Sequence, residues 1–122
     1  SGQAAPTQTR LPDGAVVELT GLAQEICRRY RGEFPDEEQR YGDAGMAWCE
    51  HDNRWILHWA LEDLGGMGDL DRHLEWLADV LVQRDFPFDR LVRNLEIGAD
   101  VAAEGGSDAL AGRLRAAAGS LG

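Results

Sequence analysis

The hydrophobic and polar positions of residues 43–64 predict a long central helix around which the rest of the chain folds. At about 100° per residue, ten apolar positions cover about two-thirds of the circumference of this helix. These positions are Met46, Trp48, Cys49, Trp55, Ile56, Leu57, Trp59, Ala60, Leu61 and Leu64. A helix on the surface of a globular protein normally carries a narrower apolar stripe. We therefore expect neighbouring elements to contact the central helix on several sides and to bury most of it.

The helical spacing of apolar residues predicts four further helices. The first spans about 13–33, although the β-branched residues Val16 and Val17 leave open a later start near Thr20. The other three are expected over 70–85, over about 88–104, and in a short segment that begins after Ser107. No stretch alternates at period two for long enough to predict a strand.

Short, glycine- or proline-containing links between these segments favour antiparallel neighbours in one bundle. We expect Gly42 to break or bend the chain before the central helix, and Asp69 to cap the helix that follows it. The sequence thus predicts an all-α fold, a single-domain bundle of about five helices over residues 13–118. Residues 1–12 are predicted to be a flexible arm and residues 119–122 a frayed terminus.

The charge of the chain limits its partners. It has 22 acidic and 12 basic residues, a formal net charge of −10, and all its basic residues are arginine. This balance argues against nucleic acid and against an anionic membrane surface, since both require clustered cations. No segment approaches the ~20 apolar residues of a membrane span, and no signal peptide is evident, so we expect a cytoplasmic protein. Arginine without lysine suggests a bacterial, high-GC source, and arginine suits an acidic helical surface because it pairs with carboxylates in bidentate geometry.

Two cysteines, Cys27 and Cys49, each fall in the apolar arc of a predicted helix. Free cysteine is among the most buried residue types, so we interpret both as small buried hydrophobic residues. A disulfide or a reactive thiol is the alternative, but the spacing is not CxxC and neither cysteine has an obvious base beside it.

Asp52, Asn53 and Asp63 are the most informative polar residues, because all three fall inside the apolar arc of the central helix. A buried carboxylate is costly without a partner. One hypothesis is that Asp52 pairs with Arg84 or Arg93, while Asn53 bonds to a nearby backbone group or helix end. The other is that Asp52 and Asn53 supply the polar groups of an aromatic pocket.

A metal site is the third possibility on the central helix. His58 and Glu62 are four residues apart and could ligate one metal ion. His51 lies two turns before His58, about 10 Å along the axis, and cannot easily complete the same site. There is no HExxH motif. We therefore predict no metal and no cofactor.

Three functions remain open. The first hypothesis is a non-catalytic regulatory or protein-interaction domain that forms a homodimer. Its predicted interface includes Trp55 or the back of the fourth helix, where Ile97 and Val101 lie opposite the main apolar face.

The second hypothesis is a small-molecule-binding or sensory domain with a pocket walled by Trp48, Trp55, Trp59 and Trp76. The candidate ligand-binding residues on the central helix are Trp48, His51, Asp52, Asn53, Trp55, His58, Trp59 and Glu62. The third hypothesis is a small metal- or acid/base-dependent enzyme that uses His51, His58 and Glu62. The sequence does not name the ligand or the partner protein.

Overall fold

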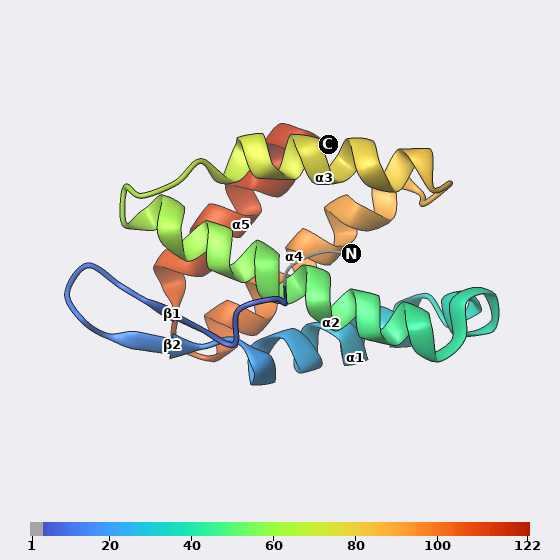
Figure 1. Ribbon diagram of the computed structural model, residues 1–122, viewed down its shortest axis with the longest axis horizontal. Helices are drawn as coiled ribbons and strands as arrows, with labels where there is room; N and C mark the ends of the chain where they lie inside the picture. Colours follow the sequence, from blue (N-terminus) through green and yellow to red (C-terminus); the bar gives the residue numbers. More distant parts are fainter. Residues whose placement is uncertain (1–3) are drawn as a thin grey trace.

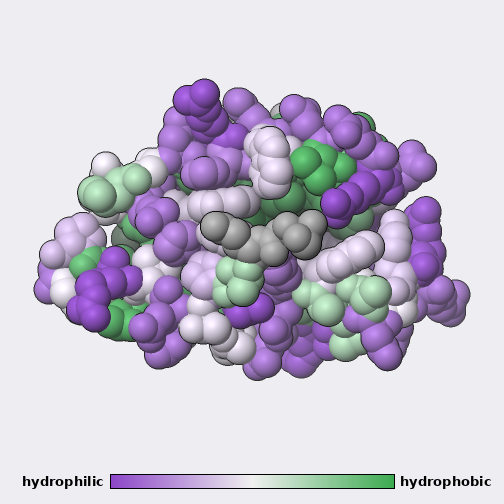
Figure 2. Space-filling view, in the orientation of Figure 1, coloured by the Kyte–Doolittle hydropathy of each residue, from purple (hydrophilic) through white to green (hydrophobic). Residues whose placement is uncertain are grey.

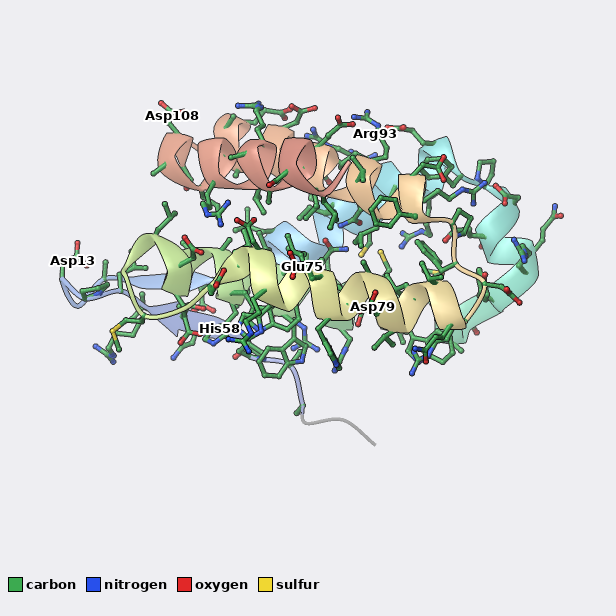
Figure 3. All side chains as sticks on the ribbon, turned by 90° about the horizontal axis from the view of Figure 1, so that it is seen from above. Asp13, His58, Glu75, Asp79, Arg93 and Asp108 are labelled. Atoms are coloured by element: carbon green, nitrogen blue, oxygen red, sulfur yellow. The ribbon has the colours of Figure 1, made fainter. Side chains whose placement is uncertain are left out.

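The computed structural model describes residues 4–122, which form five helices and one small antiparallel sheet (Figure 1). The elements are β1 (Gln8–Arg10), β2 (Val16–Glu18), α1 (Thr20–Glu33), α2 (Asp36–Leu64), α3 (Leu70–Gln83), α4 (Phe88–Glu104) and α5 (Asp108–Leu121). In Figure 1, α2 and α3 lie in front of α4 and α5, and Figure 3 shows the same two layers from above. The fold is therefore an all-α bundle of five helices, as predicted.

The N-terminal segment differs most from the prediction. Helix α1 begins at Thr20, the later of the two predicted starts. Val16 and Val17 belong instead to strand β2, which pairs antiparallel with β1. Gly14 has a φ of 91°, which lets the chain turn between the strands. β1 lies within the segment 1–12 that we expected to form a flexible arm; residues 1–3 of that arm lie outside the described part of the chain.

Side-chain contacts hold this hairpin and the residues before it against α2. Thr9 and Ala5 are buried, and Thr9 Oγ1 lies 2.8 Å from His58 Nδ1. Arg54 Nη1 donates a hydrogen bond of 3.3 Å to the carbonyl oxygen of Ala5. Figure 3 shows His58 on the side of the molecule along which the N-terminal strand passes. The hairpin therefore depends on tertiary contacts, since two strands of three residues are not stable alone.

The long α2 bends at Gly42, whose φ of 59° and ψ of −148° are not helical. Gly42 is the glycine that the sequence predicted as a break. Beyond it, α2 contacts α1, α3, α5 and β1, so the central helix does have neighbours on several sides. The prediction that most of it is buried is wrong for its first half, where Trp48 is 54% exposed. Hydrogen bonds join β1 and α5 to α2 at His58 and Asp63, in its second half.

The most extensively buried helix is α4, which packs against both α1 and α5. Gly98 faces both neighbours, since a Cβ there would make ordinary van der Waals contact, at 3.5 Å, with Ile26 Cδ1 and Leu114 Cδ1. Ile97 and Val101 are only 2% and 6% exposed. The prediction that these two residues project outward is therefore wrong, because the second face of α4 is covered within the same chain.

Bidentate arginine–carboxylate pairs join the helices. They are Arg29–Glu104, Arg93–Glu33, Arg90–Asp36 and Arg113–Asp63. Each pair connects two different helices, as expected from the geometry of the guanidinium group. Hydrophilic residues accordingly cover most of the face in Figure 2. None of the helices in residues 4–122 combines the length and apolar content that crossing a bilayer requires.

Candidate functional site

The structure divides the predicted ligand-binding residues into two groups. Trp48, Asp52 and Asn53 line a cavity, and His51 lies beside them, with Nδ1 3.2 Å from Asp52 Oδ1. The second group, which does not line this cavity, is Trp55, His58, Trp59 and Glu62. Trp76 is 60% exposed and also lies outside the cavity wall. Contrary to the prediction, the four tryptophans therefore do not wall one pocket.

The cavity has a volume of about 100 Å³ and lies among helices α1 to α4, with an opening to the surface. Its wall is mostly apolar and includes four aromatic side chains, Tyr30, Tyr41, Trp48 and Phe86. α2 provides Trp48 and Asp52 one turn apart, so both side chains face the same space. An apolar cavity with a small number of polar groups is typical of small-molecule sites.

Asp52 is one of two carboxylates, with Glu37, that α2 contributes to the cavity. Burial raises the pKa of Asp52, while its hydrogen bond with His51 and the attraction of Arg84 oppose the rise. The expected ion pair does not form. Arg93 binds Glu33, and Arg84 lies over the ring of Trp48 at 5.8 Å from its centroid. Asp52 is thus a partly desolvated carboxylate in an aromatic cavity, without an arginine in direct contact among residues 4–122.

Two buried amides form the floor of the cavity. Asn53 Nδ2 donates to Asn94 Oδ1 at 3.1 Å, and Asn94 Nδ2 donates to Asn53 Oδ1 at 2.8 Å. Asn53 Nδ2 also lies 3.0 Å from the carbonyl oxygen of Cys49, the nearby backbone group that the sequence predicted as a partner. Asn94 was not predicted, since nothing in the local pattern of α4 indicates which residue of α2 it faces.

Polar groups from three helices close one end of the cavity. The hydroxyl of Tyr30 donates a short hydrogen bond to Glu37 Oε2, and Arg90 Nη1 donates to the same oxygen at 2.7 Å. Burial is the main cause that raises the pKa of Tyr30, and the bond to Glu37 adds to it. Tyr30 and Glu37 were missed in the sequence because their spacing indicated only a core position and a helix N-terminus.

The second group of predicted residues has a structural role beside strand β1. Trp59 stacks on His73 with ring centroids 4.7 Å apart, and Trp55 stacks on Trp59 at 5.9 Å. His58 uses Nδ1 toward Thr9 and Nε2 toward Glu62, at 3.2 Å from Oε1. Both imidazole nitrogens of His58 therefore have protein partners. Residues 4–122 contain no group of three His, Cys, Asp or Glu side chains placed to hold a metal ion.

No protein-family model matches the chain, and no curated protein or solved structure is significantly similar to it.

Proposed function

We propose that this chain is a non-catalytic domain that binds a small organic cation in the cavity beside Trp48 and Asp52. The observation that carries the proposal is the partly desolvated carboxylate of Asp52 in an aromatic-walled cavity. A carboxyl group whose pKa is perturbed by burial within a cleft is a recognised indicator of a functional site. A bound cation would supply the charge partner that the neighbouring arginines do not provide by direct contact.

The cavity wall favours a cationic ligand over an anionic one. Two carboxylates, those of Glu37 and Asp52, line it beside one guanidinium, that of Arg84, and the net charge of −10 attracts cations to the whole molecule. The ring of Trp48 already has the guanidinium of Arg84 over it, so this aromatic face can accommodate a positive charge. We infer that a ligand ammonium group takes a position between the Asp52 carboxylate and the Trp48 ring, and displaces Arg84.

The volume of the cavity limits the group that enters it. An engineered protein cavity of about 150 Å³ binds benzene. The present cavity of about 100 Å³ therefore holds a group smaller than a benzene ring, such as an ammonium on a short alkyl chain. The rest of a larger ligand would extend past Trp48, at the exposed rim.

We expect n-butylammonium to bind with a dissociation constant of about a millimolar, within the limit for so few atoms. Neutral n-butanol and anionic butyrate should bind at least about tenfold more weakly, because they lack the charge-assisted bond to Asp52. Isothermal titration calorimetry measures all three. The affinity for n-butylammonium should rise with pH as Asp52 ionises, since only its ionised form attracts the cation.

Asp52→Asn is the matched control, because it preserves shape and removes the charge. It should reduce the affinity for n-butylammonium about tenfold and leave that for n-butanol unchanged. The proposal would be contradicted if the Asp52→Asn variant bound n-butylammonium as strongly as the wild-type protein. It would also be contradicted if the wild-type protein did not bind n-butylammonium at ligand concentrations of tens of millimolar.

We also propose that two copies of the chain associate, as the sequence predicted, but through a different surface. Of the residues predicted for the interface, Ile97 and Val101 are buried within one chain, and Trp55 is half-buried. The exposed apolar side chains that support association are instead Trp76 at 60% and Val82 at 54%, both on α3. Aromatic side chains are enriched in the cores of protein interfaces, which favours Trp76 as a contact residue.

Multi-angle light scattering at micromolar concentration should give twice the chain mass of 13.4 kDa. Association should strengthen as salt rises, because a charge of −10 on each copy is then screened. Trp76→Glu should shift the mass to that of one chain. A mass of 13.4 kDa at every salt and protein concentration would contradict self-association.

A further inference from the structure

The two cysteines, far apart in the sequence, meet where α1 packs against α2. Asn53 Nδ2 lies 3.6 Å from Cys27 Sγ and 3.5 Å from Cys49 Sγ, so one amide contacts both sulfur atoms. Each cysteine is the largest single influence on the pKa of the other, and both cysteines are free. Two sulfur atoms that contact the same amide nitrogen, from two packed helices, need only local movement to form a disulfide.

Each thiol adjoins a cavity, although Cys27 itself is only 2% exposed. Cys49 lines the cavity beside Asp52. Cys27 lines a second cavity, of about 330 Å³, together with Arg31 and Met46. A cavity of this volume can admit several water molecules, and hydrogen peroxide is not much larger than water. A small oxidant can therefore reach the sulfur of Cys27 from the second cavity.

We propose that Cys27 and Cys49 form a reversible oxidation site, in which a hydroperoxide converts the two thiols into a disulfide that joins α1 to α2. This proposal does not depend on the ligand proposed for the cavity at Asp52. It favours the disulfide that the sequence left as the alternative to two small buried hydrophobic residues.

The chemistry balances in two steps. In the first, the sulfur of Cys27 attacks one oxygen of hydrogen peroxide, the O–O bond breaks, and sulfenic acid and one water form. In the second, the sulfur of Cys49 attacks the Cys27 sulfur, the S–O bond breaks, and the disulfide and a second water form. The two thiols lose two electrons and two protons, and the peroxide is reduced to two water molecules.

The roles follow first from position: Cys27 shares the second cavity with Arg31, and a thiolate is stabilised beside a cation. The hydrogen bond from Cys49 lowers the pKa of Cys27, and the Asn53 amide and the charge of Arg31 act in the same direction against the effect of burial. The same contact, together with burial, raises the pKa of Cys49. Because the thiolate is the nucleophile, Cys27 is the thiol that attacks the peroxide and Cys49 is the thiol that resolves the sulfenic acid.

Intact-mass spectrometry of the full chain before and after hydrogen peroxide tests the proposal. After the peroxide is removed, the protein is denatured and alkylated with iodoacetamide. We expect oxidised wild-type protein to lose about 2 Da, to take up no alkyl group, and to regain both labelled thiols after dithiothreitol. It should remain a single chain on a non-reducing gel. The native protein should also form the disulfide at least about tenfold faster than the same protein in concentrated urea, because folding holds the sulfur atoms together.

Two single variants separate the roles of the cysteines. Cys49→Ser should accumulate a sulfenic acid at Cys27 that dimedone traps, whereas Cys27→Ser should react with peroxide much more slowly. Native wild-type protein that keeps both alkylatable thiols, forms only disulfides between chains, or oxidises no faster than in urea would overturn the proposal. Equal reactivity of the two variants would overturn the assignment of Cys27 as the attacking thiol. The wild-type measurement decides the main question even if a serine variant fails to fold.

Discussion

Asn94→Leu should lower the free energy of unfolding by about 2–3 kcal/mol, although leucine is similar in shape to asparagine. Asn53 and Asn94 are 3% and 7% exposed and exchange two hydrogen bonds. Replacing Asn94 leaves Asn53 Oδ1 in the core without its donor. The cost is therefore that of an unsatisfied buried polar group, which exceeds the net stabilisation that an intact hydrogen bond contributes.

The double variant Asn53→Leu/Asn94→Leu separates this effect from the loss of packing. Replacing both amides removes the unsatisfied group, so the double variant should be at least about 1 kcal/mol more stable than the sum of the two single variants predicts. Urea denaturation of the four proteins measures this coupling. Additive losses would show that the two amides do not depend on each other, contrary to their geometry.

Asp63→Ala should cost a similar amount, about 2–3 kcal/mol, because this one side chain joins three helices. Asp63 Oδ2 accepts a hydrogen bond of 2.7 Å from the backbone nitrogen of Leu70, at the start of α3. Its two oxygens also accept bonds of 2.9 and 3.2 Å from Arg113 on α5. Both partners of this ion pair are mostly buried, at 21% and 18% side-chain exposure, so solvent screens it little.

The stability that Asp63 contributes should depend on pH in a defined direction. The bond from Arg113, helped by that from Leu70 and opposed by burial, holds the pKa of Asp63 below its usual value. The folded protein therefore binds this proton less tightly than the unfolded chain does. The stabilisation is fully present above the unfolded pKa of about 4, and is lost as the pH falls through the lower folded pKa.

Asp63→Asn keeps an oxygen for Leu70 and removes only the charge, so it should cost about half as much as Asp63→Ala. The stability difference between wild-type protein and Asp63→Asn should be constant near neutral pH and should shrink below about pH 4. Asp100→Asn is the control, since Asp100 and Arg115 are about half exposed and their pair should contribute less than about 1 kcal/mol. A difference for Asp63→Asn that persists undiminished at pH 2 would contradict the assigned ion pair.

The helix boundaries could be predicted from the sequence wherever local capping chemistry determines them. Asp69 Oδ1 accepts a bond from the Arg72 nitrogen and caps α3, and α4 spans the predicted residues 88–104. α3 ends two residues earlier than predicted, at Gln83. The hairpin could not be predicted, because its strands have three residues each and depend on contacts such as that between Thr9 and His58.

Burial and partners were harder to predict, since both depend on residues distant in the sequence. The helical periodicity of α4 placed Ile97 and Val101 on a second face, but could not show that the same chain covers both faces. Asp52 and Asn53 were correctly identified as polar residues in an apolar arc that need an explanation. Two features follow only from how the helices pack: the pairing of Asn53 with the amide of Asn94, and the proximity of the two cysteines.

The four tryptophans provide the most direct test of the proposed cation site, because they occupy different surroundings. Trp48 lines the cavity, Trp55 and Trp59 stack beside β1, and Trp76 is exposed on α3. In a ¹⁵N-labelled protein each indole N–H gives its own resonance, which Trp→Phe variants assign. Titration with n-butylammonium should shift the Trp48 resonance in a saturable way and leave that of Trp76 unchanged, and Asp52→Asn should abolish the shift. Saturable shifts confined to the other tryptophans, or no shift at Trp48 at saturating ligand, would contradict the account.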